Sequence, residues 1–363
     1  MKFVFIINSA QNQRCIKRVN EFVERGYDVE AYAFSRCTEM RNKPNFDLRI
    51  IGKFANKTPY FARLNLMLKA IRQVLTSTRH DKEAIYYLFG LDIAMLFRFL
   101  SRKPYLFEES DLMHTYMHKK LARDVMERID KYIIRKSRLT VFTSEGFARY
   151  HFGDAYPANI CFIPNRLSPA VADIPAAARQ PLNQEHLRFA FVGGARFESV
   201  ARFAESVAKH FPQHEFHFFG HVDVNYQERY DALRQYPNVF FHGPFRNPDD
   251  LPRIYAQTDL VLSTYDVKFD NVRYAEPNKL YEAVYFEVPI IVSSGTFLAE
   301  RVSELGIGYA VDPLDERAVV GLVSSLSAAD IERKQAAARA LGKEWALNRN
   351  DAFFERIAQL DEV

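Results

Sequence analysis

The sequence predicts an α/β protein built from two doubly wound parallel-sheet domains. Short apolar runs typical of buried strands alternate with amphipathic segments typical of helices along most of the 363 residues. This length is also more than one domain usually needs. A proline- and alanine-rich stretch without periodicity, residues 167–186, interrupts the alternation and is typical of a linker.

In the first half, the alternation predicts strands at 2–7, 28–34, 48–51, 84–89, 105–108, 139–143 and 160–163, and helices at 15–25, 64–75, 93–100 and 119–137. Ligands of such sheets bind at the carboxyl ends of the strands. The loop after the first strand, residues 8–14, contains no glycine. A dinucleotide-binding fingerprint needs glycines there, so a dehydrogenase is disfavoured.

The loop predicted after Phe107 carries three carboxylates and a histidine. Glu108 and Asp111 are therefore candidate general bases at the carboxyl end of a strand. The alternative is that Ser110 or Asp111 caps the next helix. His114 and His118 are weaker candidates for the same chemistry.

Composition indicates a globular protein of a reducing compartment. Hydrophobic residues make up 48% of the chain, and the three cysteines (Cys15, Cys37 and Cys161) lack metal-ligand spacing. Residues 1–7 are one apolar run that predicts a strand rather than a signal peptide. No stretch reaches the roughly 18 apolar residues of a membrane span. We expect a cytoplasmic protein.

Charge is distributed unevenly along the chain. Residues 1–150 contain 28 Lys and Arg against 16 Asp and Glu, a net of +12, whereas the remainder has a net of −8. The basic segment 53–79, which includes Lys57, also carries an apolar helical face. This helix either rests on an anionic membrane, at the inner face of the cytoplasmic membrane, or is an ordinary half-buried helix. No nucleic-acid-binding motif accompanies it.

The second half opens with a strand at 187–192 that runs into Gly193-Gly194 and a helix at 199–209. Such a turn lets the backbone and helix N–H groups approach an anion, and Arg196 could reach a phosphate. A tight turn beside a surface arginine is the alternative. Further strands are predicted at 215–219, 239–243, 260–264, 290–292 and 308–311, and helices at 250–256, 315–325 and 331–359.

The segment 276–292 predicts a loop, a short helix begun by Pro277, and a buried strand. Lys279 and Glu282 share one face near the start of this helix. A lysine at a helix N-terminus makes a phosphate site. Alternatively, the two side chains pair on a solvated face.

These residues carry a resemblance to glycosyltransferases of the two-Rossmann-domain GT-B architecture, especially the retaining family 4. The matching segments are 191–193, 241–245, 250–260, 277–283 and 288–291, with 143–145 and 163–165 similar in outline. The resemblance implies an N-terminal acceptor domain at 1–166, a linker at 167–186, a nucleotide-sugar domain at 187–340, and a helix at 341–363 packing back toward the N-terminal domain. The active site would lie in the interdomain cleft.

The resemblance also implies a set of donor-binding residues. Glu282 would contact the ribose, while Arg196 and Lys279 would lie at the diphosphate. The remaining members of the set are Gly193, Gly194, Phe245, Arg246, Glu276 and Asn278. Two positions depart from the family pattern: Tyr274 stands where the first of two spaced glutamates is usual, and Ala201 stands where a lysine is usual.

The chemistry expected from this resemblance is sugar transfer from a nucleoside-diphosphate donor, a UDP-sugar in the first instance, to a glycan or lipid-linked hydroxyl in bacterial surface polysaccharide assembly. Because no Asp-x-Asp pair occurs on a loop, we expect transfer without a metal and no bound cofactor. Two other classes remain open. One is a nucleotide-sugar epimerase of the same fold, and the other is a non-catalytic sugar-nucleotide-binding protein.

Overall fold

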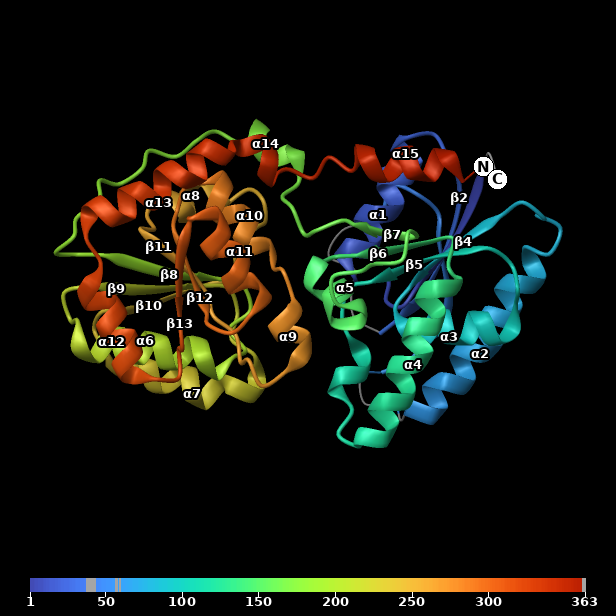
Figure 1. Ribbon diagram of the computed structural model, residues 1–363, viewed down its shortest axis with the longest axis horizontal. Helices are drawn as coiled ribbons and strands as arrows, with labels where there is room; N and C mark the ends of the chain where they lie inside the picture. The colour runs from blue at the N-terminus through green and yellow to red at the C-terminus, as the bar shows by residue number, and fades with distance from the viewer. Residues whose placement is uncertain (37–43, 56–57, 59, 361–363) are drawn as a thin grey trace. The chain divides into compact units, whose positions relative to one another are not determined.

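The computed structural model describes residues 1–36, 44–55, 58 and 60–360, which form two compact units (Figure 1). Unit 1 contains Met1–Ile163 together with the C-terminal helix α15 (Asp351–Gln359), and unit 2 is Pro164–Asn350. Cys37 and Lys57 lie outside the described residues. Each unit is built on one parallel sheet, as the sequence predicts.

In the described part of the chain, unit 1 forms a seven-stranded parallel sheet of order β3-β2-β1-β4-β5-β6-β7. Its strands are β1 (Lys2–Ile7), β2 (Asp28–Ser35), β3 (Leu48–Lys53), β4 (Ile85–Phe89), β5 (Tyr105–Glu109), β6 (Leu139–Phe142) and β7 (Ile160–Phe162). Its helices are α1 (Gln13–Glu24), α2 (Tyr60–Ser77), α3 (Leu91–Leu100), η1 (Met113–Tyr116), α4 (Lys120–Lys136), α5 (Glu145–Phe152) and α15. The central strands are buried on both faces because helices cover the sheet on either side.

Aromatic packing explains why α15 belongs to unit 1 although it ends the chain. The Phe354 ring lies 5.0 Å from that of Phe22 on α1, and the Arg25 guanidinium stacks 4.1 Å from the Phe354 centroid. Arg356 donates hydrogen bonds to the carbonyls of Ala158 and Ile160, which precede and begin β7. These contacts bury an apolar face that the helix could not cover alone.

Unit 2 has a six-stranded parallel sheet, within the described residues, of order β10-β9-β8-β11-β12-β13. Its strands are β8 (Arg188–Val192), β9 (Glu215–Phe219), β10 (Val239–Gly243), β11 (Leu260–Ser263), β12 (Ile290–Ser293) and β13 (Gly308–Val311). Its helices are η2 (Pro169–Asp173), α6 (Glu198–His210), η3 (Val224–Tyr226), α7 (Gln227–Asp231), η4 (Ala232–Gln235), α8 (Leu251–Ala256), α9 (Asp270–Tyr274), α10 (Asn278–Tyr285), α11 (Phe297–Leu305), α12 (Glu316–Ser325), α13 (Ala328–Leu341) and α14 (Lys343–Ala346).

The segment predicted as a linker packs on unit 2. Leu167 and Val171 are buried in the unit 2 core, and the Gln180 amide donates to the Ala256 carbonyl at 2.9 Å. The apolar side chains among the prolines and alanines supply this anchoring. Unit 2 therefore begins about twenty residues before its first strand.

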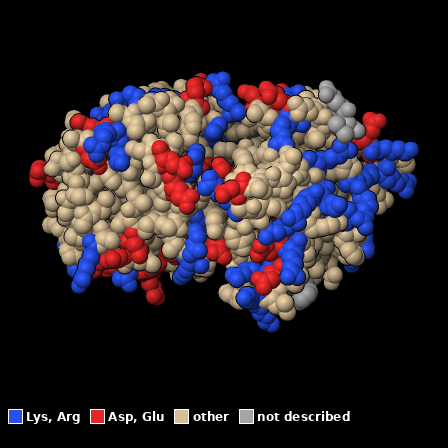
Figure 2. Space-filling view, in the orientation of Figure 1, with Lys and Arg blue, Asp and Glu red and all other residues tan. Residues whose placement is uncertain are grey.

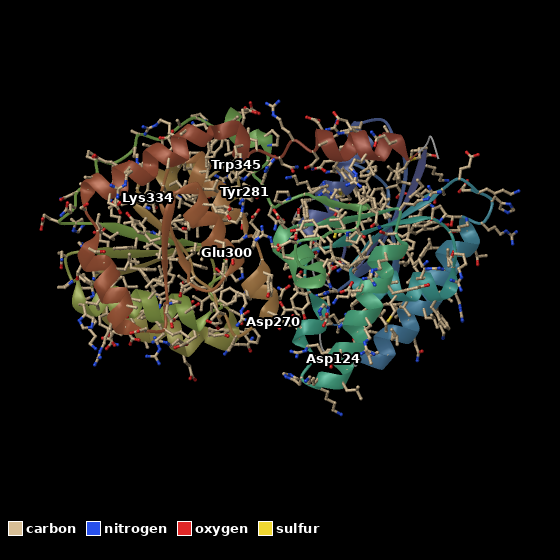
Figure 3. All side chains as sticks on the ribbon, viewed as in Figure 1. Asp124, Asp270, Tyr281, Glu300, Lys334 and Trp345 are labelled. Atoms are coloured by element: carbon tan, nitrogen blue, oxygen red, sulfur yellow. The ribbon has the colours of Figure 1, made fainter. Side chains whose placement is uncertain are left out.

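The prediction of one continuous helix over 331–359 is wrong. The chain breaks after α13 at Gly342, whose φ is 78°, and again between α14 and α15. A positive φ ends a helix, and glycine adopts it without steric cost. Trp345 consequently packs on Tyr281 of α10, with ring centroids 5.1 Å apart, and not on the phenylalanines of α15 (Figure 3).

Candidate active site

The turn after β8 lies against the end of β9 in unit 2. The Gly193 amide, at φ 137°, donates to the Phe219 carbonyl at 2.8 Å. Gly220, at φ 132°, is so close to this turn that a Cβ on it would lie 2.0 Å from the Gly193 carbonyl oxygen. Glycines at both positions therefore bring two strand ends together and leave the Gly193-Gly194 backbone uncovered by side chains of its own.

We expect Gly220→Ala to lower the free energy of unfolding by at least about 1–3 kcal/mol, because alanine disfavours this φ and its Cβ would clash with the Gly193 carbonyl. Urea denaturation measures the change. The control is Gly321→Ala in α12, where no atom lies within 4 Å of the new Cβ. Alanine should stabilise that helix by about 0.5–1 kcal/mol. Equal effects of the two substitutions would contradict the close approach.

Lys279 brings a positive charge to the glycine turn. Its side chain is on the first turn of α10 and the residue is only 6% exposed. The ammonium nitrogen lies 4.7 Å from the Phe191 ring centroid and 3.2 Å from the place a Cβ on Gly193 would take. Within the described residues, no carboxylate lies within 4.0 Å of it. A buried ammonium without an ion-pair partner is well placed to receive an anion.

The N-terminus of α10 adds to this positive field. Pro277 occupies the N-cap position and provides no side-chain hydrogen bond, so the first amides of the helix are not capped by that residue. Uncapped amides and the helix dipole favour an anion. The N-terminus of α6 differs from our expectation, because the Ser199 amide already donates to Asp266 Oδ1 at 2.9 Å.

Glu282 is buried at 1% exposure, and both of its carboxylate oxygens accept hydrogen bonds. Tyr255 donates from its hydroxyl at 2.6 Å, and Asn278 donates from its side-chain amide. Burial raises the pKa of the Glu282 carboxyl, while the Lys279 charge and these two hydrogen bonds oppose the rise. In this structure the Tyr255 hydrogen bond to Glu282 joins α8 to α10, Asn278 supports Glu282 from the same helix, and the predicted ribose contact stays a prediction.

Glu276 is also occupied by protein contacts. Tyr281 donates its hydroxyl hydrogen to Glu276, and the Arg301 Nε lies 3.6 Å from the other carboxylate oxygen. This arrangement fixes the loop that leads into α10. The placement gives Glu276 a structural function, and its predicted donor contact stays a prediction.

The other predicted donor residues are less closely grouped. Arg196 is exposed beyond Gly194, with its guanidinium 5.4 Å from the Phe197 ring centroid and, in the described chain, no ion pair. Phe245 packs partly buried on the unit 2 core, and the Arg246 amide donates to Asp250 Oδ2 at 2.7 Å. These two residues follow β10, the edge strand, which is two strands away from β8.

Sequence reasoning missed polar groups beside the glycine turn. Asp266 follows β11 and accepts from Ser199, as described above. Asp266 Oδ2, Ser199 Oγ and Thr264 Oγ1 are buried without a hydrogen-bond partner in the part of the chain that the structure describes. The signal in the sequence was the position of Thr264 at the end of a predicted strand and of Asp266 just beyond it, where ligand-binding residues gather.

In unit 1 the placement of Glu108 does not support a catalytic function, and the predicted strand end needs correction. β5 continues to Glu109, so Glu108 lies inside the sheet and is fully buried. Arg18 Nε donates to Glu108 Oε2 at 3.1 Å, and the Tyr87 hydroxyl donates to the same oxygen at 2.6 Å. Glu108 is thus one half of a buried ion pair that joins α1 to the sheet.

Asp111 lies on the exposed bend after β5, and its predicted function as a general base stays a prediction. Its charge contributes to raising the pKa of the neighbouring Glu109 carboxyl to about 8, although burial is the main cause. His118 is exposed on the same segment, whereas His114 is buried.

The basic segment forms α2, whose Met67, Ile71 and Val74 are buried while Lys69 and Arg72 are exposed. This is the pattern of a half-buried helix with a basic solvated face. Lys and Arg side chains are abundant over unit 1 on the visible face (Figure 2). None of the helices in the described ranges combines the length and the hydropathy required for a transmembrane span.

Comparison with known proteins agrees with this arrangement. Residues 170–342, most of unit 2, match the family model for glycosyl transferases group 1. The succinoglycan biosynthesis protein ExoL of Rhizobium meliloti (strain 1021) is 23% identical over 239 residues, which cover 62% of this chain and 58% of ExoL.

Two solved structures resemble the whole chain. Sucrose-phosphate synthase from Thermosynechococcus elongatus has a TM-score of 0.71 at 16% identity, covering 100% of this chain and 98% of the synthase. HepE from Anabaena, solved in complex with UDP, has a TM-score of 0.70 at 14% identity, covering 100% of both chains. Together with the two parallel-sheet units, these similarities show that the chain has the GT-B fold and that residues 170–342, in unit 2, are similar to glycosyl transferases group 1.

Proposed function

We propose that this protein transfers a sugar from a nucleoside-diphosphate donor, a UDP-sugar, to a hydroxyl of a glycan or lipid-linked acceptor in bacterial surface polysaccharide assembly. The group 1 domain supports the class of reaction. A relative named for succinoglycan biosynthesis supports the pathway type. A structural neighbour solved with UDP supports the nucleotide.

The observation that carries this proposal is the buried residue Lys279, whose ammonium lies against the Gly193 turn at the start of α10 and forms no ion pair with any described residue. When a sugar leaves its donor, negative charge develops on the diphosphate. A preorganised cation and helix amides stabilise that charge in a site where water does not compete. Arg196, exposed at the same turn, supplies a second cation.

We further propose Asp111 as the group that accepts the proton of the acceptor hydroxyl, since it is an exposed carboxylate at the carboxyl end of β5. The basic surface of unit 1 suits an acceptor that carries phosphate or lies at an anionic membrane. A cytoplasmic protein that contacts the inner face of the cytoplasmic membrane would meet such an acceptor.

The experiment is calorimetric titration of the purified full chain with UDP, GDP and CMP and their sugars, followed by product analysis with lipid-linked and glycan acceptors. We expect one nucleotide and its sugar derivative to bind. The free nucleotide should be released from that nucleotide sugar only when an acceptor is present. Formation of an isomeric nucleotide sugar without acceptor would identify an epimerase. Binding without any turnover across the acceptors would identify a binding protein, and absence of binding would overturn the proposal.

Donor binding should not require a divalent cation, because Lys279, Arg196 and the α10 amides supply the positive charge. We expect the dissociation constant for the UDP-sugar to be the same in EDTA as in Mg²⁺ or Mn²⁺, measured by calorimetry. A requirement for added metal would instead indicate that a cation bridges the diphosphate.

A further inference from the structure

The face of β5 opposite Glu108 carries a second buried cluster in unit 1. Glu109, the last residue of β5, meets His114 of η1, Asp130 of α4 and His151 of α5. All four residues are buried, with exposures from 0 to 5%. Ligand atoms of Glu109, His114 and Asp130 all lie within 4.8 Å of one another.

Several polar atoms of this cluster make no hydrogen bond of regular geometry. In the described residues, they are Glu109 Oε2, both nitrogens of His114, both oxygens of Asp130, and His151 Nδ1, although His114 Nδ1 and Asp130 Oδ2 lie 3.2 Å apart. No Lys or Arg of the described chain forms an ion pair with Glu109 or Asp130. Buried polar groups are nearly always hydrogen-bonded, and a group of exceptions calls for an unseen partner such as an ion.

The spacing of the donor atoms fits one particular partner. Oxygen and nitrogen ligands about 2.0–2.2 Å from a tetrahedral Zn²⁺ lie about 3.4 Å from one another. His114 Nδ1 is 3.2 Å from Asp130 Oδ2, and His151 Nε2 is 3.2 Å from Glu109 Oε1 and 3.9 Å from Asp130 Oδ2. Glu109, His114 and Asp130 thus form the compact part of the donor set, and His151 adjoins two of them, so it would have to shift toward His114 to complete a tetrahedron.

We propose that Glu109, His114, Asp130 and His151 bind a divalent transition-metal ion, with Zn²⁺ as the best match. Two imidazoles and two carboxylates make a suitable donor set, and the charge of the ion balances the two carboxylates. Because every ligand is buried, the site is closed and structural. The ion joins β5, η1, α4 and α5, and fixes the segment between Glu109 and His114, which carries Asp111.

The first measurement is elemental analysis of the full chain purified without added metal, followed by removal of metal with a chelator and titration with Co²⁺. We expect about one equivalent of zinc per chain in the isolated protein. The stripped protein should have a lower melting temperature, and one equivalent of Co²⁺ should restore it with the visible absorption of a tetrahedral site. A metal-free protein that takes up no Co²⁺ would overturn the proposal.

Variants locate the ion. Asp130→Asn removes a charged ligand of the ion. Loss of a residue that only hydrogen-bonds to a ligand weakens metal binding roughly 10- to 100-fold, so loss of this ligand should weaken it more. His118→Gln, exposed on the same segment, should bind metal as the parent does. His242→Gln should also have no effect, although it disrupts the histidine pair in which His217 Nδ1 lies 3.0 Å from His242 Nε2.

Loss of metal in His242→Gln with retention in Asp130→Asn would place the ion on that histidine pair and overturn the proposal. If Asp130→Asn does not fold, the zinc content and Co²⁺ spectrum of His114→Gln decide in its place. A soluble His114→Gln with unchanged metal affinity would also exclude the cluster as the site.

Discussion

Replacing Lys279 with methionine is expected to weaken binding of the UDP-sugar by about 10- to 100-fold. A hydrogen bond to a charged group contributes about 1.5–3 kcal/mol, and 1.4 kcal/mol corresponds to a tenfold change in affinity. Methionine keeps the length and apolar contacts of the side chain beside Phe191 but removes the charge. Since Lys279 is buried and forms no ion pair with the described residues, its removal should leave the melting temperature unchanged or raise it.

The matched control is Lys334→Met on α13, labelled in Figure 3, whose ammonium also stacks on a ring, 5.1 Å from the Tyr309 centroid. Calorimetry with UDP should give the parental affinity for this variant. Undiminished binding in Lys279→Met would remove Lys279 from the donor site. A large fall in melting temperature in Lys279→Met would show that the lysine is structural.

Replacing Arg18 with methionine is expected to lower the free energy of unfolding by about 3–5 kcal/mol, the usual cost of leaving one member of a buried ion pair without its partner. Arg18 is 4% exposed and donates to the fully buried Glu108, which also accepts from Tyr87. When the guanidinium is removed, the Glu108 carboxylate keeps only the hydrogen bond from the neutral Tyr87 hydroxyl. Urea denaturation followed by circular dichroism measures the loss.

The double variant Arg18→Met/Glu108→Gln should recover much of this stability, because the uncompensated charge is then gone. The control for a general effect of arginine loss is Arg49→Met in unit 1. Arg49 forms ion pairs with Glu30 and Asp47, but its side chain is 54% exposed. Exposed pairs contribute less than about 1 kcal/mol. Equal destabilisation by Arg18→Met and Arg49→Met would contradict the assigned role of Glu108.

The sequence by itself determined the two parallel sheets and most strand positions. These features follow from patterns among residues close together in the sequence: strand periodicity, apolar runs, and breaks at glycine and proline. A short segment of sequence is therefore enough to predict them. The prediction of the α10 helix succeeded for the same reason. The long C-terminal helix failed because the alternation of apolar residues continued past Gly342, where the backbone turns.

The placement of the charged side chains depended on tertiary structure. Whether Glu108 or Glu109 is exposed at the end of its strand depends on the length of the strand and on which helix covers each face of the sheet. Both residues are buried in the structure. In the α10 segment, the sequence predicted donor contacts for both Lys279 and Glu282, with Glu282 the stronger candidate. Only the structure shows that Glu282 accepts a hydrogen bond from Tyr255, 27 positions away, and that Lys279 has no ion-pair partner among the described residues.

The cluster of Glu109, His114, Asp130 and His151 illustrates the limit of sequence reasoning most clearly. Its members come from four elements across more than forty positions, with no metal-ligand spacing to reveal them. The sequence therefore determined which elements form and in what order they lie. The tertiary structure decided which charges meet and which stay unpaired, because burial and long-range contacts, not local spacing, set the electrostatic environment of each side chain.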